Sequence, residues 1–184
     1  MTIKCSVYIA ASIDGFIARP DGEIDWLLRP EYTPTEMRGL SYEDFISTVD
    51  AIVMGRHSFE KVLSFDSWPY EKTPVVVLSS RGVTVPAHLS GKVRVEAGTP
   101  WEIVAGLAAE GKKHLYIDGG VTIQRFLAAG LIDEITITQI PILLGAGIPL
   151  FSAEGSEHPL RLIDSAASDN GFVQVRYAVQ SVTV

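Results

Sequence analysis

Short apolar runs alternate along the chain with stretches whose apolar residues recur at helical spacing. Runs of strand length occupy residues 3–12, 50–55, 74–78, 93–95, 114–117 and 134–142. Helices are expected at residues 41–48, from residue 56 onward, at 100–110, and after the glycine pair at 119–120. The pattern therefore predicts strands that alternate with helices through residue 142.

Local signals mark the ends of the predicted helices. Ser41 has the chemistry of an N-cap, with Asp44 at the third helical position, and Pro100 suits the first turn of its helix. Gly130 is expected to cap the C-terminus of the helix that follows the glycine pair.

The C-terminal part of the chain has a different pattern. Asn170-Gly171 separates two runs at residues 160–168 and 172–179, and this dipeptide predicts a β-hairpin. Residues 143–151 form an apolar stretch broken by glycines, expected to be a loop. Together these features predict one α/β domain over residues 1–184, with a mostly parallel sheet, helices on both faces and an antiparallel edge.

Composition and charge narrow the class of protein. The 184 residues are 47% hydrophobic and carry a net charge of -7, which argues against nucleic acid and anionic membranes as partners. The single cysteine, Cys5, lies in a predicted strand and is expected to be buried, so no zinc site is expected. The N-terminus leads directly into a strand without the features of a signal peptide, and we expect a cytoplasmic protein.

Three predicted strands end in turns rich in small residues and hydrogen-bond donors. These turns are Gly55-Arg56-His57-Ser58, Ser79-Ser80-Arg81 and Asp118-Gly119-Gly120. In an open α/β sheet, ligands bind beyond the carboxyl ends of the strands, where helix N-termini favour anions. Each turn alone is also compatible with an ordinary strand-to-helix connection, but together they favour a site for a phosphate-bearing ligand.

The order of these motifs resembles the dihydrofolate reductase superfamily. The resemblance rests on residues 10–18 (Ala-Ala-Ser-Ile-Asp-Gly-Phe-Ile-Ala) together with the three turns, and it covers nearly the whole chain. Residues 144–151 (Leu-Gly-Ala-Gly-Ile-Pro-Leu-Phe) are most similar to the bacterial branch of this superfamily. That branch contains the RibD C-terminal domain, which is the riboflavin-biosynthesis reductase domain. The implied fold is the mixed, mostly parallel sheet of dihydrofolate reductase.

The resemblance implies NADPH as cofactor and hydride transfer to a C=N or C=O carbon of a flat pterin- or pyrimidine-like ring. The implied cofactor contacts come from the end of the first strand and from the three turns: Ala11, Ile17, Gly55, Arg56, His57, Ser58, Leu78, Ser79, Ser80, Arg81, Gly119, Gly120 and Val121. The residues also favour NADPH over NADH, because Ser79-Ser80-Arg81 offers a cation and two hydroxyls to a 2′-phosphate with no acid nearby in sequence.

The catalytic acid is less well defined by the sequence. Asp14 and Asp25 flank the segment that should cover the nicotinamide, and either is expected to assist protonation with a raised pKa. Glu43 and Asp44 remain further candidates. Trp26, Tyr42 and Phe45 are expected to wall the substrate pocket.

Two functional alternatives follow. The first is an NADPH-dependent reductase, and the second is a non-catalytic NADP(H)-binding or sensing module that lacks a secure acid. In either case, the apolar C-terminal strands predict an exposed edge and hence a homodimer.

Overall fold

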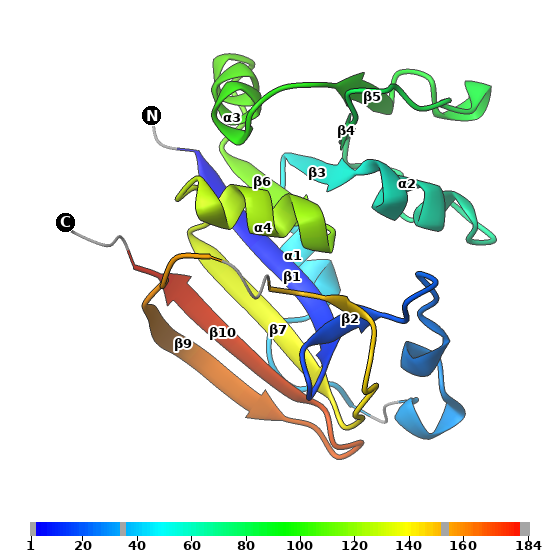
Figure 1. Ribbon diagram of the computed structural model, residues 1–184, viewed down its shortest axis with the longest axis vertical. Helices are drawn as coiled ribbons and strands as arrows, with labels where there is room; N and C mark the ends of the chain where they lie inside the picture. Colours follow the sequence, from blue (N-terminus) through cyan, green and yellow to red (C-terminus); the bar gives the residue numbers. More distant parts are fainter. Residues whose placement is uncertain (1–2, 34–35, 152–154, 181–184) are drawn as a thin grey trace.

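The computed structural model describes residues 3–33, 36–151 and 155–180. Its centre is an eight-stranded sheet in the order β5-β4-β3-β6-β1-β7-β10-β9 (Figure 1). The strands of this sheet are β1 (Lys4–Ser12), β3 (Ala51–Gly55), β4 (Val75–Leu78), β5 (Val93–Glu96), β6 (His114–Asp118), β7 (Glu134–Ile140), β9 (Leu160–Ala167) and β10 (Val173–Val179). The first six run parallel, while β10 is antiparallel to both β7 and β9. This arrangement confirms the predicted fold class.

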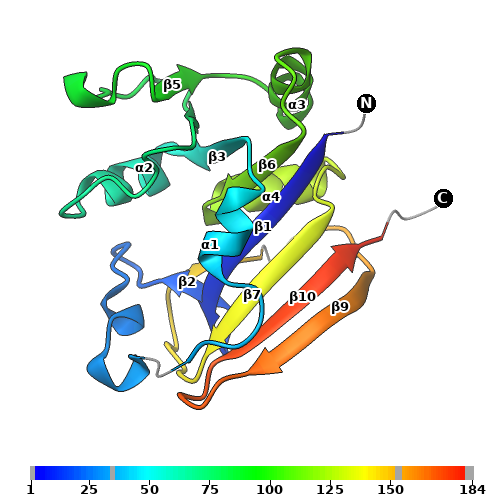
Figure 2. The same ribbon diagram turned by 180° about the vertical axis from the view of Figure 1, so that it is seen from behind.

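Helices cover both faces of the parallel part of the sheet. They are α1 (Tyr42–Ser47), α2 (Arg56–Leu63), α3 (Pro100–Ala109) and α4 (Gly120–Ala128), with 3-10 turns at Asp25–Leu27, Pro30–Tyr32 and Ala87–Leu89. Helices α3 and α4 lie on the side facing the viewer in Figure 1, and α1 lies on the opposite side in Figure 2. No described helix is long and apolar enough to cross a membrane.

The alternation of side chains along the strands produces two apolar cores. On the α3–α4 side, Leu115 and Ile117 of β6 pack with Phe126 of α4. On the α1–α2 side, Tyr116 of the same strand packs with Phe45 and Phe59. A parallel sheet needs apolar residues on both faces, which is why its strands appear as continuous apolar runs in the sequence.

The local signals at the helix ends act as predicted. The Ser41 hydroxyl accepts a hydrogen bond from the Asp44 amide at the start of α1. At the start of α3, Thr99 and Glu102 form a reciprocal capping box. Gly130 has φ 67° directly after α4, the left-handed conformation that glycine adopts at helix C-termini.

Two segments are more ordered than the sequence predicts. Residues 143–151 contain a short strand, β8 (Ile148–Pro149), which pairs with β2 (Phe16–Ala18) in a separate two-stranded sheet. The 3-10 turn Pro30–Tyr32 lies in a stretch without a helical pattern in the sequence, and its Tyr32 ring packs edge-on against Phe172. Both segments are held by partners far away in sequence, which a local pattern does not show.

No described helix covers either face of the C-terminal hairpin (Figures 1 and 2). On the face away from α4, residues 38–40 pack against the hairpin, and the Leu40 amide donates to Gln174 Oε1. On the α4 side of the sheet, Leu160, Leu162 and Val173 are exposed by 43%, 53% and 36%. An apolar sheet face of this kind is unusual on an isolated domain.

The β2–β8 contact yields a stability prediction. A Cβ atom on Gly147 would collide with the Ala18 carbonyl oxygen and with the Phe16 ring, so Gly147→Ala should destabilise the fold by about 1–3 kcal/mol. Gly106 in α3 has open space at the same atom, and Gly106→Ala should instead stabilise by about 0.5–1 kcal/mol. Urea unfolding of both variants measures the contrast, and equal effects would contradict the proposed close approach.

Candidate functional site: a basic pocket beyond the strand ends

The three turns singled out in the sequence lie at the ends of neighbouring strands. Strands β4, β3 and β6 are adjacent and parallel, so their carboxyl ends share one edge of the sheet. Helix α2 starts directly after β3, and α4 starts after the turn that follows β6. The expected clustering of the turns is therefore confirmed.

Helices α2 and α4 differ from α1 and α3 in how they begin. Gly55 is the N-cap of α2 and Gly119 is the N-cap of α4, and neither helix has a side-chain cap. The first N–H groups of a helix have no partner within it, and they combine with the helix dipole to attract anions. The two glycine-capped helices therefore offer donors at the same sheet edge.

Close packing brings these two helix starts together. Gly119 has φ 89°, and a Cβ atom there would collide with the Ser58 hydroxyl of α2. A Cβ atom on Gly55 would lie 3.0 Å from the Thr122 hydroxyl of α4. A Cβ atom on Gly120 would lie 3.0 Å from Ile17 Cδ1 of β2. At Gly119 the positive φ and the contact with Ser58 both favour glycine, whereas a Cβ atom at Gly55 or Gly120 would require neighbouring atoms to shift slightly.

A pocket of 580 Å³ lies beside these helix starts. It contains six of the residues expected to bind the cofactor together with three that the sequence analysis missed. Its lining residues are Arg56, His57, Leu78, Ser79, Ser80, Arg81, Ala97, Gly98 and Arg125. The three additional residues come from the end of β5 and from α4, elements whose proximity depends on the strand order.

The pocket is dominated by arginines. Arg56 Nε donates to Glu60 Oε1 at 2.6 Å, an ion pair within α2 that fixes the guanidinium at the pocket edge. This cation lowers the pKa of the Glu60 carboxyl, so the acid stays ionised. Arg125 donates to the Gly98 carbonyl at 3.1 Å. Arg81 adds a third cation beside two serine hydroxyls.

The other expected cofactor residues lie nearby but outside this pocket. Ala11 is buried at the end of β1, and Ile17 packs against Gly120 across the β2–β8 pair. Val121 is 67% exposed on the first turn of α4. The described structure thus gathers the cofactor set along one continuous edge, with the basic residues at one end.

Asp14 and Asp25 are engaged in local structure. Asp14 accepts hydrogen bonds from the Leu144 amide at 3.1 Å and the Gly145 amide at 2.8 Å, and the Ser12 hydroxyl also donates to it. Asp25 accepts two bonds from the guanidinium of Arg19, at 2.6 and 3.0 Å.

These contacts reverse the expected direction of both pKa values. The Ser12 hydroxyl and the two amides lower the pKa of Asp14, and Arg19 lowers the pKa of Asp25. The expectation of raised values is therefore wrong, because the carboxylates have donors rather than a dry environment. Their geometry is that of anchors for neighbouring loops, and it lends no support to proton donation by either.

Two of the aromatic residues expected around the substrate, Tyr42 and Phe45, pack against Tyr8. Phe45 stacks on Tyr8 with ring centroids 4.8 Å apart, and Tyr42 meets Tyr8 edge-on at 5.8 Å. Trp26 is completely buried, and its indole N–H has no hydrogen-bond partner among the described residues. Tyr42 is half-buried and is therefore more available to a ligand than Trp26 or Phe45.

Asp118 is a further acid that the sequence analysis treated only as part of a glycine turn. It ends β6, and its carboxylate lies 3.4 Å from the Tyr116 hydroxyl, which also donates to the Tyr8 carbonyl at 2.9 Å. The residue retains some exposure, yet protein atoms surround the carboxyl closely. Desolvation raises the pKa of Asp118 to about 6, and the hydrogen bonds from Gly119 and Tyr116 only partly oppose it.

The raised pKa of Asp118 makes the stability of the fold depend on pH. The folded protein holds the Asp118 proton to a higher pH than an unfolded chain with a pKa near about 3.9, so ionisation of this group lowers stability as pH rises through about 6. Asp118→Asn cannot ionise, and its melting temperature relative to the wild type should therefore rise between pH 4 and pH 8, by roughly a few degrees.

Thermal melts at several pH values test this prediction. Asp66→Asn is the matched control, because Asp66 is exposed and its substitution should give a flat difference. If the difference in melting temperature between Asp118→Asn and the wild type also stayed constant with pH, the Asp118 carboxyl would have an ordinary pKa and the prediction would be wrong.

Comparisons with known proteins agree with this geometry. The model of the RibD C-terminal domain family matches residues 4–174. The Bacillus subtilis (strain 168) protein YwjB is 38% identical over 166 residues, which cover 88% of this chain and 90% of YwjB. The protein YyaP of the same organism is 26% identical over 179 residues, covering 92% and 91% of the two chains.

Solved structures extend the comparison to reductases. A candidate riboflavin biosynthesis protein from Shewanella sp. PV-4 matches with a TM-score of 0.85 and 40% identity, over 97% of this chain and all of that one. Dihydrofolate reductase from Enterococcus faecalis, complexed with NADP(H), shares the fold with a TM-score of 0.62 and 16% identity, each chain being covered to 97%. With the family model matching nearly its whole length, this chain belongs to the RibD C-terminal domain family.

Proposed function

We propose that this protein is an NADPH-dependent reductase that transfers hydride to a flat pterin- or pyrimidine-like heterocycle. The observation that carries the proposal is the pair of glycine-capped helix starts beside a pocket lined by three arginines. The family and its reductase neighbours support the same class of activity.

The donor set fits a dinucleotide phosphate. The starts of α2 and α4 have no side-chain cap, so their first backbone N–H groups are available to a pyrophosphate. The pocket volume of 580 Å³ suits the adenosine part of a cofactor. Arg81, with Ser79 and Ser80, supplies the cation and hydroxyls that a 2′-phosphate requires.

When bound, the nicotinamide supplies the hydride, and the protein's residues supply binding and orientation. We expect Ala11 and Ile17 to contact the nicotinamide, and Ile17 lies on β2, which pairs with β8 and approaches Gly120 at the start of α4. Asp14 anchors the segment after β7 by accepting hydrogen bonds from the Leu144 and Gly145 amides.

The alternative is a non-catalytic NADP(H)-binding module. It is favoured by the engagement of both expected acids, Asp14 and Asp25, in loop contacts. The buried carboxyl of Asp118, whose pKa of about 6 suits proton exchange near neutrality, favours the enzyme. NADPH consumption with dihydrofolate or with a riboflavin-pathway pyrimidine separates the two, because a sensor binds the cofactor without turnover.

The cofactor assignment predicts a selective loss of affinity. Arg81→Ala and Arg125→Ala should each weaken NADPH binding by about 10- to 100-fold, because a charge-assisted bond is worth roughly 1.5–3 kcal/mol. Arg81→Ala should leave NADH binding within about twofold, since NADH has no 2′-phosphate. Arg161→Ala, an exposed arginine on β9, is the matched control.

Fluorescence titration of both cofactors against each variant measures these changes. Equal affinities of the wild type for NADPH and NADH, or an equal loss for both with Arg81→Ala, would overturn the assignment.

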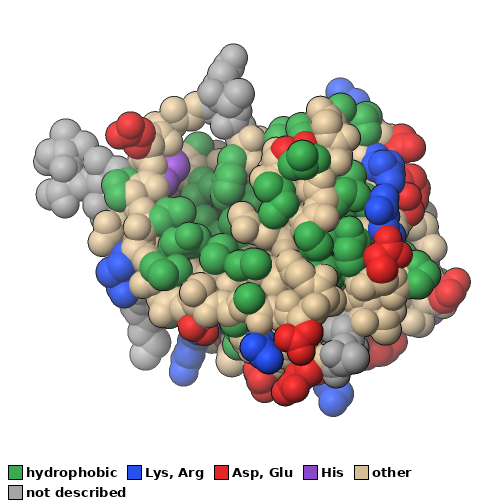
Figure 3. All heavy atoms as spheres, turned by 90° about the horizontal axis from the view of Figure 1, so that it is seen from below, with side chains coloured by type: hydrophobic (Ala, Val, Ile, Leu, Met, Phe, Trp, Pro, Cys, Tyr) green, Lys and Arg blue, Asp and Glu red, His purple; other side chains and the backbone are tan. Residues whose placement is uncertain are grey.

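We further propose that the protein is a homodimer that pairs through the uncovered apolar face of β7, β10 and β9. On this face Tyr177 lies opposite Leu162, and the space-filling view in Figure 3 shows a broad patch of hydrophobic side chains. A sheet of three strands, each about eight residues long, presents about 25 by 15 Å. This is about half of the roughly 800 Å² per partner of a stable interface, so neighbouring surface must contribute the rest.

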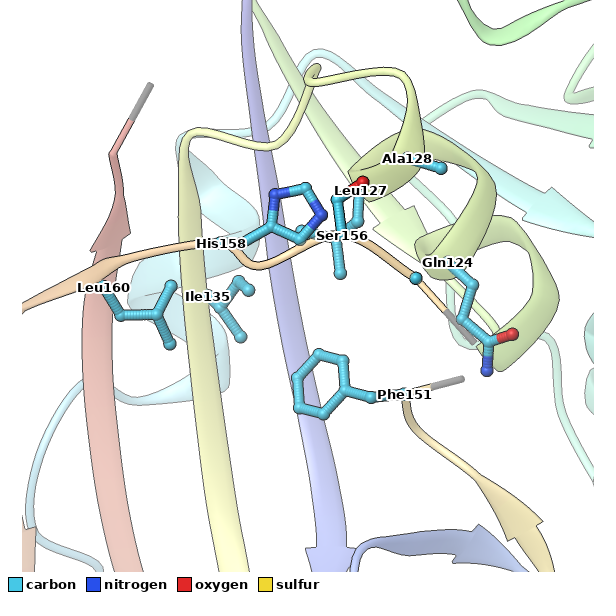
Figure 4. A pocket seen from close by; sticks show the side chains of 9 residues that line it. Gln124, Leu127, Ala128, Ile135, Phe151, Ser156, His158 and Leu160 are labelled. Atoms are coloured by element: carbon cyan, nitrogen blue, oxygen red, sulfur yellow. The ribbon is translucent and has the colours of Figure 1, made fainter. Parts of the chain in front are cut away.

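A second pocket lies beside this face and extends its apolar surface. It has a volume of 260 Å³ between α4 and β7, and Leu127, Ile135 and Phe151 point into it (Figure 4). His158 lines the edge of this pocket. The pocket can accept an apolar side chain from a second copy.

A charge placed on this face should separate the protomers. Leu162→Lys should give a monomer of 20.0 kDa by light scattering at micromolar concentration, while the wild type gives twice that mass. Arg161→Ala is the control, because residue 161 pairs with Ala178 and so faces the other side of the sheet. A monomeric wild type, or a Leu162→Lys variant that remains dimeric, would contradict this interface.

A further inference from the structure

Glu60 is a carboxylate on the second turn of α2 that contacts two residues of the basic pocket. Arg56 Nε donates to Glu60 Oε1 at 2.6 Å, and His57 Nδ1 lies 3.5 Å from Glu60 Oε2. Arg56 and His57 line the pocket, whereas Glu60 is outside its lining. The carboxylate therefore acts on the pocket through these two side chains.

The hydrogen bond to Glu60 leaves most of the Arg56 guanidinium free. It uses only Nε, while Arg19 gives both Nε and Nη2 to Asp25. In the described part of the chain, Nη1 and Nη2 of Arg56 make no hydrogen bond. These two nitrogens carry four N–H donors in one plane, a geometry that binds two oxygens of a phosphate at once. Glu60 thus holds one edge of the fork and leaves the other edge for a ligand.

Arg56 also differs from the other two arginines of the pocket in its charge environment. Among the described residues, neither Arg81 nor Arg125 takes part in an ion pair, whereas Arg56 pairs with Glu60. The hydrogen bond from Arg56 lowers the pKa of Glu60, so its carboxylate is ionised at neutral pH. The Glu60 side chain is 41% exposed, so water and salt screen its repulsion of a phosphate, while its hold on Arg56 is a direct contact. Positioning therefore outweighs repulsion.

The composition of the pocket indicates which phosphate the free edge of Arg56 meets. Arg56 shares the pocket with Ser80 and Arg81 at the end of β4, and the Gly119-Gly120 turn is outside the lining. Strand β3 separates β4 from β6 in the sheet, which places that turn two strands away. The pocket therefore suits the adenosine end of a cofactor, and its anion is a 2′-phosphate.

We propose that Glu60 is a positioning residue that presents the free edge of Arg56 to the 2′-phosphate of the cofactor and thereby sets the preference for NADPH. The proposal rests on the cofactor function proposed above and adds a residue that lies outside the pocket. An arginine side chain without a partner samples many rotamers, and ordering it on binding costs free energy. The contact with Glu60 removes part of this cost before the ligand arrives, because a bound Nε restricts the plane of the guanidinium.

Two pairs of ligands test the proposal by titration. NADPH and NADH differ by the 2′-phosphate, as do adenosine 2′,5′-bisphosphate and adenosine 5′-monophosphate. Glu60→Ala should weaken both ligands that carry the 2′-phosphate by about 5- to 20-fold and change the other two by less than about twofold. Glu60→Gln keeps an acceptor for Arg56 Nε without the charge, and should bind NADPH within about threefold of the wild type. Glu71→Ala removes an exposed ion pair with Lys92 outside the pocket and, as the matched control, should change none of the affinities.

A double-mutant cycle identifies the contact through which Glu60 acts. Arg56→Ala should weaken NADPH binding by about 10- to 100-fold, and adding Glu60→Ala to this variant should cause no further loss. An ion pair between exposed residues four positions apart contributes little to helix stability, so all these variants should melt close to the wild type.

Four results would overturn the positioning role. These are an unchanged NADPH affinity in Glu60→Ala, an equal loss of affinity for NADH, an equal loss in Glu60→Gln, and a loss that persists in the absence of Arg56. An equal loss for NADH would mean that Glu60 supports the structure of α2 rather than the direction of Arg56. Equal affinities of the wild type for NADPH and NADH would instead overturn the proposed cofactor function, so the two failures are distinguishable.

Discussion

The first N–H groups of a helix have no partners within that helix, and the helices of this protein differ in whether a side chain caps these groups. Helices α1 and α3 satisfy it internally, through Ser41 and through the capping box of Thr99 and Glu102. Helices α2 and α4 begin at Gly55 and Gly119 without a side-chain cap. The unsatisfied donors of α2 and α4 meet at one sheet edge, and the arginine pocket and the close glycine contacts are arranged around that edge.

The same edge explains why the two-stranded sheet of β2 and β8 matters. Ile17 of β2 packs against Gly120 at the start of α4, and Gly147 allows β8 to approach the Ala18 carbonyl. Asp14 holds the intervening loop through Leu144 and Gly145. An acid whose pKa is lowered by such bonds stabilises the closed loop while it remains ionised, which is the opposite of what proton donation requires.

Asp118 shows the complementary situation. Its position at the end of a buried strand removes water from the carboxyl without supplying a cation, and this raises its pKa to about 6. Acids whose pKa values are raised by desolvation are common at functional sites.

The sequence by itself determined the element types, the mostly parallel sheet and the C-terminal hairpin, because apolar periodicity, helix caps and an Asn170-Gly171 turn are local signals. It also identified the residues of the three strand-end turns. Only the tertiary structure decided that Arg125 and Gly98 join the pocket, that β8 pairs with β2, and that protein atoms desolvate the Asp118 carboxyl. These features depend on strand order and on contacts between residues more than twenty positions apart, and desolvation in particular is a property of everything packed around a group rather than of its neighbours in the chain.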